Sequence, residues 1–370
     1  MTKKLLYEIS IIRPLIIFLL VVYHALCVFT KGWVPPDGVP ANSVYWWLGH
    51  LISGFRIETI AFVGGYVFSY QCIELSKRNS FGSFVWKKFK RLIVPCFVFG
   101  ILYYLLFRFN PERFSWNVAF WKVANGIGHL WFLPMLFWCF LLTWCFDRLL
   151  QWVNDCKPDC YRILGWSLLL VFAGLSLFRV TGLRLGLSRV PYFIFYFYLG
   201  YWIRAEHHHI DYGGKQSVWM AVVLWILYLF FVLLHQQATH YQMPGCDFHC
   251  PQWLLGSSQL SLRLMALGHT FFGILALYVS VMVWLDKHKS PDSQPGTFLR
   301  SCSNVCYGVY VLHMFFMQYL YYYSPLPQWC CETEIGSWLM PWLVLVLTLV
   351  PSVVLTLLLL KTRFGRTLIG

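Results

Sequence analysis

The chain has 370 residues, of which 59% are hydrophobic and 12% are charged, whereas soluble domains carry roughly 25% charged residues. This composition excludes a soluble domain and indicates a polytopic membrane protein. The formal net charge of +14 is explained by anchoring next to anionic lipid, and the sequence contains no glycine-rich phosphate loop, so a nucleic-acid partner is excluded as well.

Windows of about twenty apolar residues mark the expected membrane-spanning helices. Ten such windows follow one another without a repeat or a long linker. We therefore predict an all-α polytopic membrane protein with about ten transmembrane helices around a central polar cavity, forming a single domain over residues 1–370. In chain order the windows cover residues 9–30, 44–73, 91–107, 127–147, 163–178, 190–204, 216–236, 262–285, 303–323 and 338–360.

An even number of spans places both termini on the same side of the membrane. If that side is the cytoplasm, nineteen Lys and Arg residues fall in the inner segments and eight in the outer segments. This asymmetry follows the positive-inside rule, so we predict cytoplasmic termini. In this topology a disulfide is an open alternative for four cysteines of the outer loops, whereas a zinc site is disfavoured because no paired CxxC spacing is present. These cysteines are Cys246, Cys250, Cys330 and Cys331.

The first window contains Arg13 and His24, eleven residues apart. At ~100° and ~1.5 Å per residue, this spacing returns to within about 20° of the same helix face and rises about 16 Å. A cation at the bilayer centre costs at least ~2.5 kcal/mol, so we expect this face to turn toward a cavity or a partner helix rather than toward lipid. The two residues therefore predict a polar shaft, although a lone His24 would also suit helix packing.

The second window contains Arg56 and Glu58, and Glu58 is the only acidic residue well inside a predicted span. Residues two apart on a helix do not face each other, so each is expected to find a partner on another helix. Bracing and catalysis are both open for this pair. If Glu58 lies near His24, it would orient an imidazole that accepts the proton of a hydroxyl nucleophile near neutral pH.

Four cations gather before the third window, in the sequence WKKFKRLIVP at residues 86–95. Lys87, Lys88, Lys90 and Arg91 suit an anchor on the inner side of the membrane. They also suit a clamp for a phosphorylated cofactor, because Lys and Arg neutralise phosphate oxygens. Both interpretations stay open on the residues alone.

Five local sequences together resemble the acyltransferase-3 family of bacterial membrane O-acyltransferases. The first is the pair Arg13 and His24 with ten residues between them, which is that family's signature. Arg56 and Glu58 depart from the family pattern, which is more apolar around them in many members. The other four sequences follow in the family's order and span nearly the whole chain: SGFRIETIAFVGGYVFS at 53–69, KKFKRLIVP at 87–95, HLWFLPMLF at 129–137 and YGVYVLHMFF at 307–316.

The resemblance implies transfer of an acyl group, usually acetyl, from cytoplasmic acetyl-CoA or another acyl-CoA to a hydroxyl of a cell-surface glycan or a glycolipid. The enzyme would lie in the bacterial cytoplasmic (inner) membrane and would use no metal. His24 would be the general base and Arg13 would stabilise the donor or the developing charge. Donor binding would involve Arg13, Lys87, Lys88, Lys90 and Arg91, and His129, Trp131 and His313 would be pocket or packing residues. As departures from the family pattern, Glu58 would assist catalysis and Arg56 would line the substrate pocket.

Two other functions remain open on the sequence. A transporter or flippase of a polar substrate could use Arg13, His24 and Glu58 as a relay, but no inverted repeat supports it. An assembly or sensing subunit without chemistry would leave the buried charges unexplained. The acceptor sugar, the length of the acyl chain, the choice between direct transfer and an acyl-enzyme, and the formation of a homodimer stay open.

Overall fold

The computed structural model describes residues 6–30, 32–76, 80–207, 212–238, 259–289 and 293–370. Every regular element in these ranges is helical, and each of the ten predicted windows contains a helix. The prediction of an all-α polytopic membrane protein is therefore confirmed, while the central polar cavity stays a prediction. Eight helical segments in the described ranges are long and apolar enough to cross a membrane: Tyr7–Leu26, Ser43–Ile73, Phe81–Phe107, Gly128–Cys156, Pro158–Ser176, Gly214–Gln236, Gln259–His288 and Glu334–Lys361.

The two remaining windows hold α9 (Val190–Ala205) and α13 (Thr297–Tyr322). Helix α9 has only 16 residues, and the 26 residues of α13 include polar side chains such as Asn304 and His313. By contrast, α10 (Gly214–Ala238) and α15 (Glu334–Lys361) have only 22% and 28% of their most apolar stretches buried. Helices that face lipid are expected to expose apolar side chains in this way.

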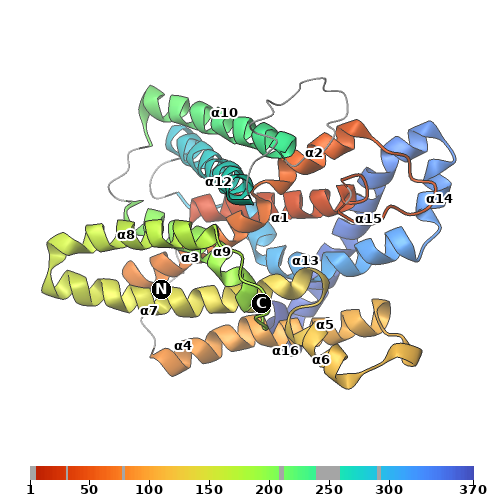
Figure 1. Cartoon of the computed structure of the whole chain (residues 1–370), viewed down its shortest axis with the longest axis horizontal. Coiled ribbons are helices and arrows are strands. Elements are labelled where there is room, and N and C mark those ends of the chain that lie inside the picture. The colour runs from red at the N-terminus through yellow and green to blue at the C-terminus, as the bar shows by residue number, and fades with distance from the viewer. Residues whose placement is uncertain (1–5, 31, 77–79, 208–211, 239–258, 290–292) are drawn as a thin grey trace. The chain divides into compact units, whose positions relative to one another are not determined.

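The chain divides into two compact units, the first comprising Met1–Ile60 and Asp211–Leu355 and the second comprising Ala61–Ile210 and Thr356–Gly370. In the first unit, α1 (Tyr7–Leu26) packs against α13 and against two further helices. These two helices are α2 (Ser43–Ser53) and α12 (Gln259–His288). Figure 1 shows α10 lying beside α12. The short helix α14 (Leu326–Cys331) follows α13.

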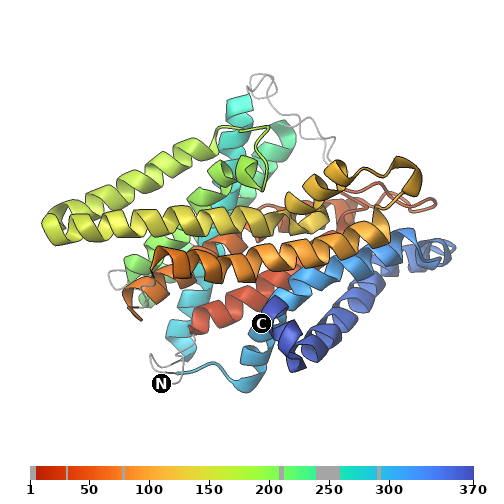
Figure 2. The same ribbon diagram turned by 90° about the horizontal axis from the view of Figure 1, so that it is seen from below.

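In the second unit, α7 (Phe132–Cys156) and α8 (Pro158–Ser176) form a hairpin that turns at Lys157. Figure 2 shows these two helices side by side, and α9 packs against both of them. Helix α5 (Val94–Phe107) packs against α6 (Trp116–Ala124). The unit also contains most of α3 (Arg56–Ile73), the short helix α16 (Arg363–Ile369) and the 3-10 turns η2 (Pro111–Arg113), η3 (Gly128–Trp131) and η4 (Leu187–Arg189).

Buried charges in the second unit are paired within it. Arg204 is only 7% exposed, forms an ion pair with Glu74 and donates from Nη1 to the hydroxyl oxygen of Tyr66 over 3.2 Å. Asp147 is 2% exposed and accepts a hydrogen bond of 2.7 Å from the hydroxyl of Tyr201. A buried ion that is paired and hydrogen-bonded avoids most of the desolvation penalty, so these contacts are what allows the charges to lie inside the unit.

The second predicted span is interrupted, because α2 ends at Ser53 and α3 begins at Arg56. Backbone carbonyls freed by such a break need donors, since lipid offers none. The hydroxyl of Tyr228 donates to the carbonyl of Leu51, and the hydroxyl of Thr270 donates to the carbonyl of Gly54 over 2.7 Å. The break therefore lies against α10 and α12, whose polar side chains satisfy it.

The third predicted span begins ten residues earlier than expected. Helix α4 (Phe81–Lys88) leads into a π-helix, η1 (Phe89–Ile93), and then into α5. The amide of Val94 donates to the carbonyl of Phe89, five residues back, and Pro95 has no amide to donate to the carbonyl of Arg91. A proline that removes an ordinary helical hydrogen bond explains the wider turn. The basic run therefore lies inside a continuous helical segment and not in a loop at its entrance.

Helices α3 and α9 cross closely through a pair of glycines. A methyl group on Gly65 would overlap the carbonyl oxygen of Phe197, and one on Gly200 would overlap the carbonyl oxygen of Phe62. Helix backbones approach this closely only where small residues leave room between them. This crossing fixes the part of α3 that carries Phe68, Gln71 and Cys72.

We predict that Gly65→Ala lowers the free energy of unfolding by about 1–3 kcal/mol, the usual effect of overpacking a filled interface. The measurement is the melting temperature of the detergent-purified protein, read as loss of the monodisperse peak in size-exclusion chromatography. The matched control is Gly174→Ala in α8, where no atom lies within 4 Å of the added methyl. Because Ala favours helix over Gly, this control is expected to melt at the wild-type temperature or slightly above it. Equal melting temperatures for Gly65→Ala and wild type would contradict the close crossing.

Candidate active site

Helix α1 carries Arg13 and His24, and both side chains are half-buried. Arg13 lies close enough to the thiol of Cys306 in α13 to interact with it electrostatically. His24 contacts His313, which lies seven residues after Cys306 in α13. Both residues therefore lie on the face of α1 that packs against α13, as their eleven-residue spacing predicts.

His24 and His313 form a direct contact between α1 and α13. Nε2 of His313 lies 3.0 Å from Nδ1 of His24, and the two rings meet end to end, with their centroids 5.1 Å apart and their planes inclined by 28°. The other nitrogen of His313, Nδ1, lies 3.0 Å from the carbonyl oxygen of Val309 and 2.8 Å from that of Tyr310. The side chain of His313 is completely buried, so His24 is the more exposed ring of the pair.

Two aromatic side chains complete the surroundings of the His24 ring. Trp33 stacks on it almost in parallel, with centroids 5.6 Å apart and planes inclined by 10°, and Tyr23 meets it edge-on at 5.6 Å. Trp33 also meets Tyr321 of α13 edge-on. Sequence reasoning missed Trp33, which lies in the segment that follows α1. Its position nine residues after His24 gave no periodic signal.

Arg56 finds its partner on another helix, as expected. Its guanidinium lies 3.3 Å from the ring centroid of Tyr23 in α1, and its Nη1 donates to the carbonyl of Ser53 over 3.0 Å. This contact places Arg56 next to the neighbour of His24. It also supplies a donor at the break between α2 and α3.

The prediction that Glu58 lies near His24 and orients it stays a prediction. Glu58 is 8% exposed and lies close enough to Tyr228 of α10 to interact with it electrostatically. Nδ1 of His24 contacts Nε2 of His313, a partner that sequence reasoning did not find. His313 comes from the helix packed on the same face of α1, which cannot be read from the sequence. A catalytic role of Glu58 stays a prediction.

His129 and Trp131 lie in the second unit, on η3. His129 is 7% exposed and lies edge-on to Tyr103, with centroids 6.2 Å apart. The guanidinium of Arg189 lies 3.8 Å from the ring centroid of Trp131, and Phe193 packs on the same ring. Both residues stay predictions as members of a substrate pocket.

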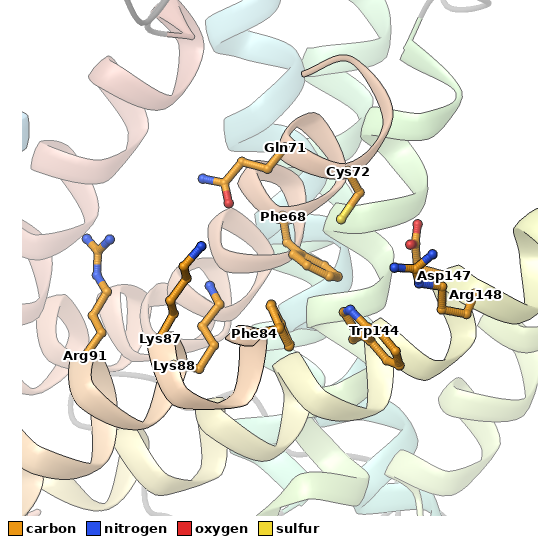
Figure 3. Close-up of a pocket in the computed structure, with 10 residues that line it drawn as sticks. All are labelled: Phe68, Gln71, Cys72, Phe84, Lys87, Lys88, Arg91, Trp144, Asp147 and Arg148. Carbon is orange, nitrogen blue, oxygen red and sulfur yellow. The ribbon is translucent and has the colours of Figure 1, made fainter. Parts of the chain in front are cut away.

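The second unit contains a pocket of about 170 Å³ that we call the basic pocket. In Figure 3, Lys87, Lys88 and Arg91 rise from one helical segment toward the same space, with Gln71 of α3 above them. Three of the five predicted donor-binding cations thus come together. The full lining is Phe68, Gln71, Cys72, Phe84, Lys87, Lys88, Arg91, Trp144, Asp147 and Arg148.

Lys90 is the exception among the predicted cations. Its ammonium lies 4.8 Å from the ring centroid of Trp86, and the residue is exposed and absent from the lining of the basic pocket. Successive residues of a helix point in different directions, so four cations in five positions cannot all share one face. Lys90 therefore lies outside this pocket, and its role in donor binding stays a prediction.

Aromatic rings form the other side of the basic pocket. The ammonium of Lys88 lies 3.4 Å from the ring centroid of Phe140, and Phe84 stacks on Trp144 with the planes inclined by 24°. Arg148 lies over the same tryptophan at 5.0 Å. A group of cations beside flat rings suits an anionic ligand that also has a planar part. Gln71, Trp144 and Arg148 were missed by sequence reasoning, because their positions give no local pattern.

Metal ligands and disulfides were also considered from the sequence. Within the described part of the chain, no group of three or more His, Cys, Asp or Glu side chains is placed to hold a metal ion. Cys330 and Cys331 of α14 are free thiols, and burial raises the pKa of both. Cys246 and Cys250 lie outside the described residues.

Comparison with known proteins gives one match. The family model described as an acyltransferase domain matches residues 6–361, which is nearly the whole chain. No curated protein and no solved structure matches. The matched range contains Arg13, His24, His313 and the basic pocket, so the resemblance based on five local sequences is confirmed. The protein belongs to the acyltransferase-3 family and is a membrane acyltransferase.

Proposed function

We propose that this protein transfers an acyl group, in the simplest case acetyl, from cytoplasmic acyl-CoA to a hydroxyl of a cell-surface or lipid-linked glycan. It would do so in the bacterial cytoplasmic membrane, with both termini in the cytoplasm. One contact carries the proposal: Nδ1 of His24 meets Nε2 of His313, so the ring of His24 is oriented while it remains half-buried. An oriented imidazole at a partly open position suits a general base.

The proposed reaction is a single acyl transfer. His24 takes the proton of the acceptor hydroxyl as the oxygen attacks the thioester carbonyl, and a carbon–oxygen bond forms. The tetrahedral intermediate then collapses, the carbon–sulfur bond breaks and the thiolate leaves. The imidazolium of His24 returns its proton to that thiolate, so the products are the ester and free CoA thiol.

Arg13 would stabilise negative charge in this reaction. A fixed cation is most effective where water is excluded, because the lower effective dielectric strengthens its interaction with an oxyanion or a donor phosphate. Arg13 lies on the same helix face as His24, about three turns away along α1. Its half-buried side chain is thus on the side of α1 where the reaction is proposed.

The basic pocket would hold the phosphorylated end of the donor. Lys87, Lys88 and Arg91 would neutralise phosphate oxygens, and the face of Trp144 suits the planar adenine. A whole small-molecule site usually has ~300–1,000 Å³. The pocket, at about 170 Å³, is smaller than that and fits one end of an extended donor better than the complete molecule.

Loss of the base or of the cation on α1 should stop transfer. We expect His24→Ala to lower kcat by roughly 10²–10⁴-fold, the usual contribution of general acid–base catalysis, and Arg13→Ala to abolish detectable transfer. The assay measures release of CoA thiol from acetyl-CoA, with the surface glycan fraction of a gene-deletion strain as acceptor. Mass spectrometry of that fraction identifies the new ester. Transfer at the wild-type rate by either folded variant would refute its role.

Removal of cations from the basic pocket should weaken binding of the donor. We expect Lys87→Ala and Arg91→Ala each to raise KM for acetyl-CoA by about 10-fold or more, because a hydrogen bond to a charged group contributes about 1.5–3 kcal/mol. Acetyl-pantetheine has no nucleotide phosphates, so its KM should not change. The control is Lys157→Ala, which removes an exposed cation outside the pocket. An equal rise of KM for both donors would show that the pocket does not recognise phosphate.

A further inference from the structure

His313 has hydrogen-bonding partners that determine where its proton lies. Its Nδ1 faces the carbonyl oxygens of Val309 and Tyr310 at 3.0 and 2.8 Å. Carbonyl oxygens only accept hydrogen bonds, so Nδ1 must carry the proton. The side chain is completely buried, and a second proton would add the cost of taking a cation out of water, so the ring is neutral and its Nε2 has a lone pair.

This lone pair in turn determines which ring nitrogen of His24 carries the proton. Nε2 of His313 can only accept, and it lies 3.0 Å from Nδ1 of His24, which must therefore donate. A neutral imidazole has one N–H, so Nε2 of His24 is its basic nitrogen. We propose that His313 is a positioning residue that holds His24 in this tautomer, an inference that rests on the proposed role of His24 as general base.

The same contact serves both states of the base. When His24 takes a proton on Nε2, its Nδ1–H still donates to His313, whose lone pair now accepts from a cation. Hydrogen bonds in which one partner is charged are stronger than those between neutral groups, so the contact favours proton transfer to His24. In serine hydrolases a carboxylate fixes the tautomer of the histidine in this way. Here a neutral ring does so without bringing a negative charge into the interior.

Stacking adds a second restraint on the His24 ring. Trp33 lies nearly parallel to it, with an interplanar angle of 10°. Rotation of the imidazole would break the hydrogen bond to His313 and the contact with Trp33. The structure therefore fixes the direction of the His24 lone pair as well as its identity.

The tautomer can be read directly, without any transfer assay. Histidine-selective ¹⁵N labelling and solid-state NMR distinguish a protonated ring nitrogen from an unprotonated one, and a His24→Gln sample identifies the signals of His24. We expect wild-type His24 to show protonated Nδ1 and unprotonated Nε2, and His313→Leu to lose this single tautomer. A wild-type His24 protonated on Nε2, or a His24 signal unchanged by His313→Leu, would overturn the inference.

The kcat of His313 variants distinguishes a positioning role of His313 from a packing role. We expect His313→Leu to lower kcat about 10- to 100-fold, comparable to losing the partner of a metal-bound histidine, with KM for acetyl-CoA unchanged. His313→Gln should recover much of this loss, because its amide oxygen can accept from Nδ1 of His24. The control is Met317→Leu, one turn further along α13 and equally buried, which should keep the wild-type kcat.

Several outcomes of these measurements are decisive. Equal losses of kcat in His313→Leu and Met317→Leu, or no recovery of kcat in His313→Gln, would overturn the positioning role. His313 would then serve only in helix packing. If His313→Leu does not fold, the wild-type ¹⁵N spectrum and His313→Gln still test the inference. If wild-type protein shows no acyl transfer, the proposed function fails while the NMR result still decides the tautomer.

Discussion

The structure depends on a single constraint, that polar groups inside a protein of this composition must be satisfied by other protein groups. The contact between His24 and His313 is the clearest case, since both nitrogens of His313 and Nδ1 of His24 have defined partners. The freed carbonyls between α2 and α3 are met by hydroxyls of other helices, and the buried cation of Arg204 is paired with Glu74. Where lipid replaces water, these contacts decide which helices can pack together.

The basic pocket shows how aromatic rings help to hold cations inside the protein. Lys88 rests on the ring of Phe140, and Arg148 lies over Trp144. An aromatic face stabilises a cation while leaving its hydrogen-bond donors available, whereas a carboxylate partner would compete with an anionic ligand. Asp147 also lines this pocket, and its carboxylate accepts hydrogen bonds from Tyr201 and Gln151.

Much of the fold and part of the site follow from the sequence. Apolar windows gave the helices, and the spacing of Arg13 and His24 placed both on the face that meets α13, because helical periodicity is a local property. The partner of His24 could not be found in this way, since His313 lies 289 residues further along the chain and only packing joins them. The same holds for Trp144 in the basic pocket. Lys90 lies outside the basic pocket, and the second predicted span is broken just before Arg56. Both features arise from backbone geometry, which apolar patterns do not encode.

The π-helix η1 has a consequence for the phase of the helix that contains it. One extra residue in a turn rotates everything after it by roughly 100° relative to an uninterrupted α-helix. Three cations before and within η1 therefore face the basic pocket, while α5 after it exposes apolar side chains such as Ile101 and Leu105. One continuous helical segment thus meets two different requirements, and substitutions on one side of the π-helix need not disturb the face presented on the other.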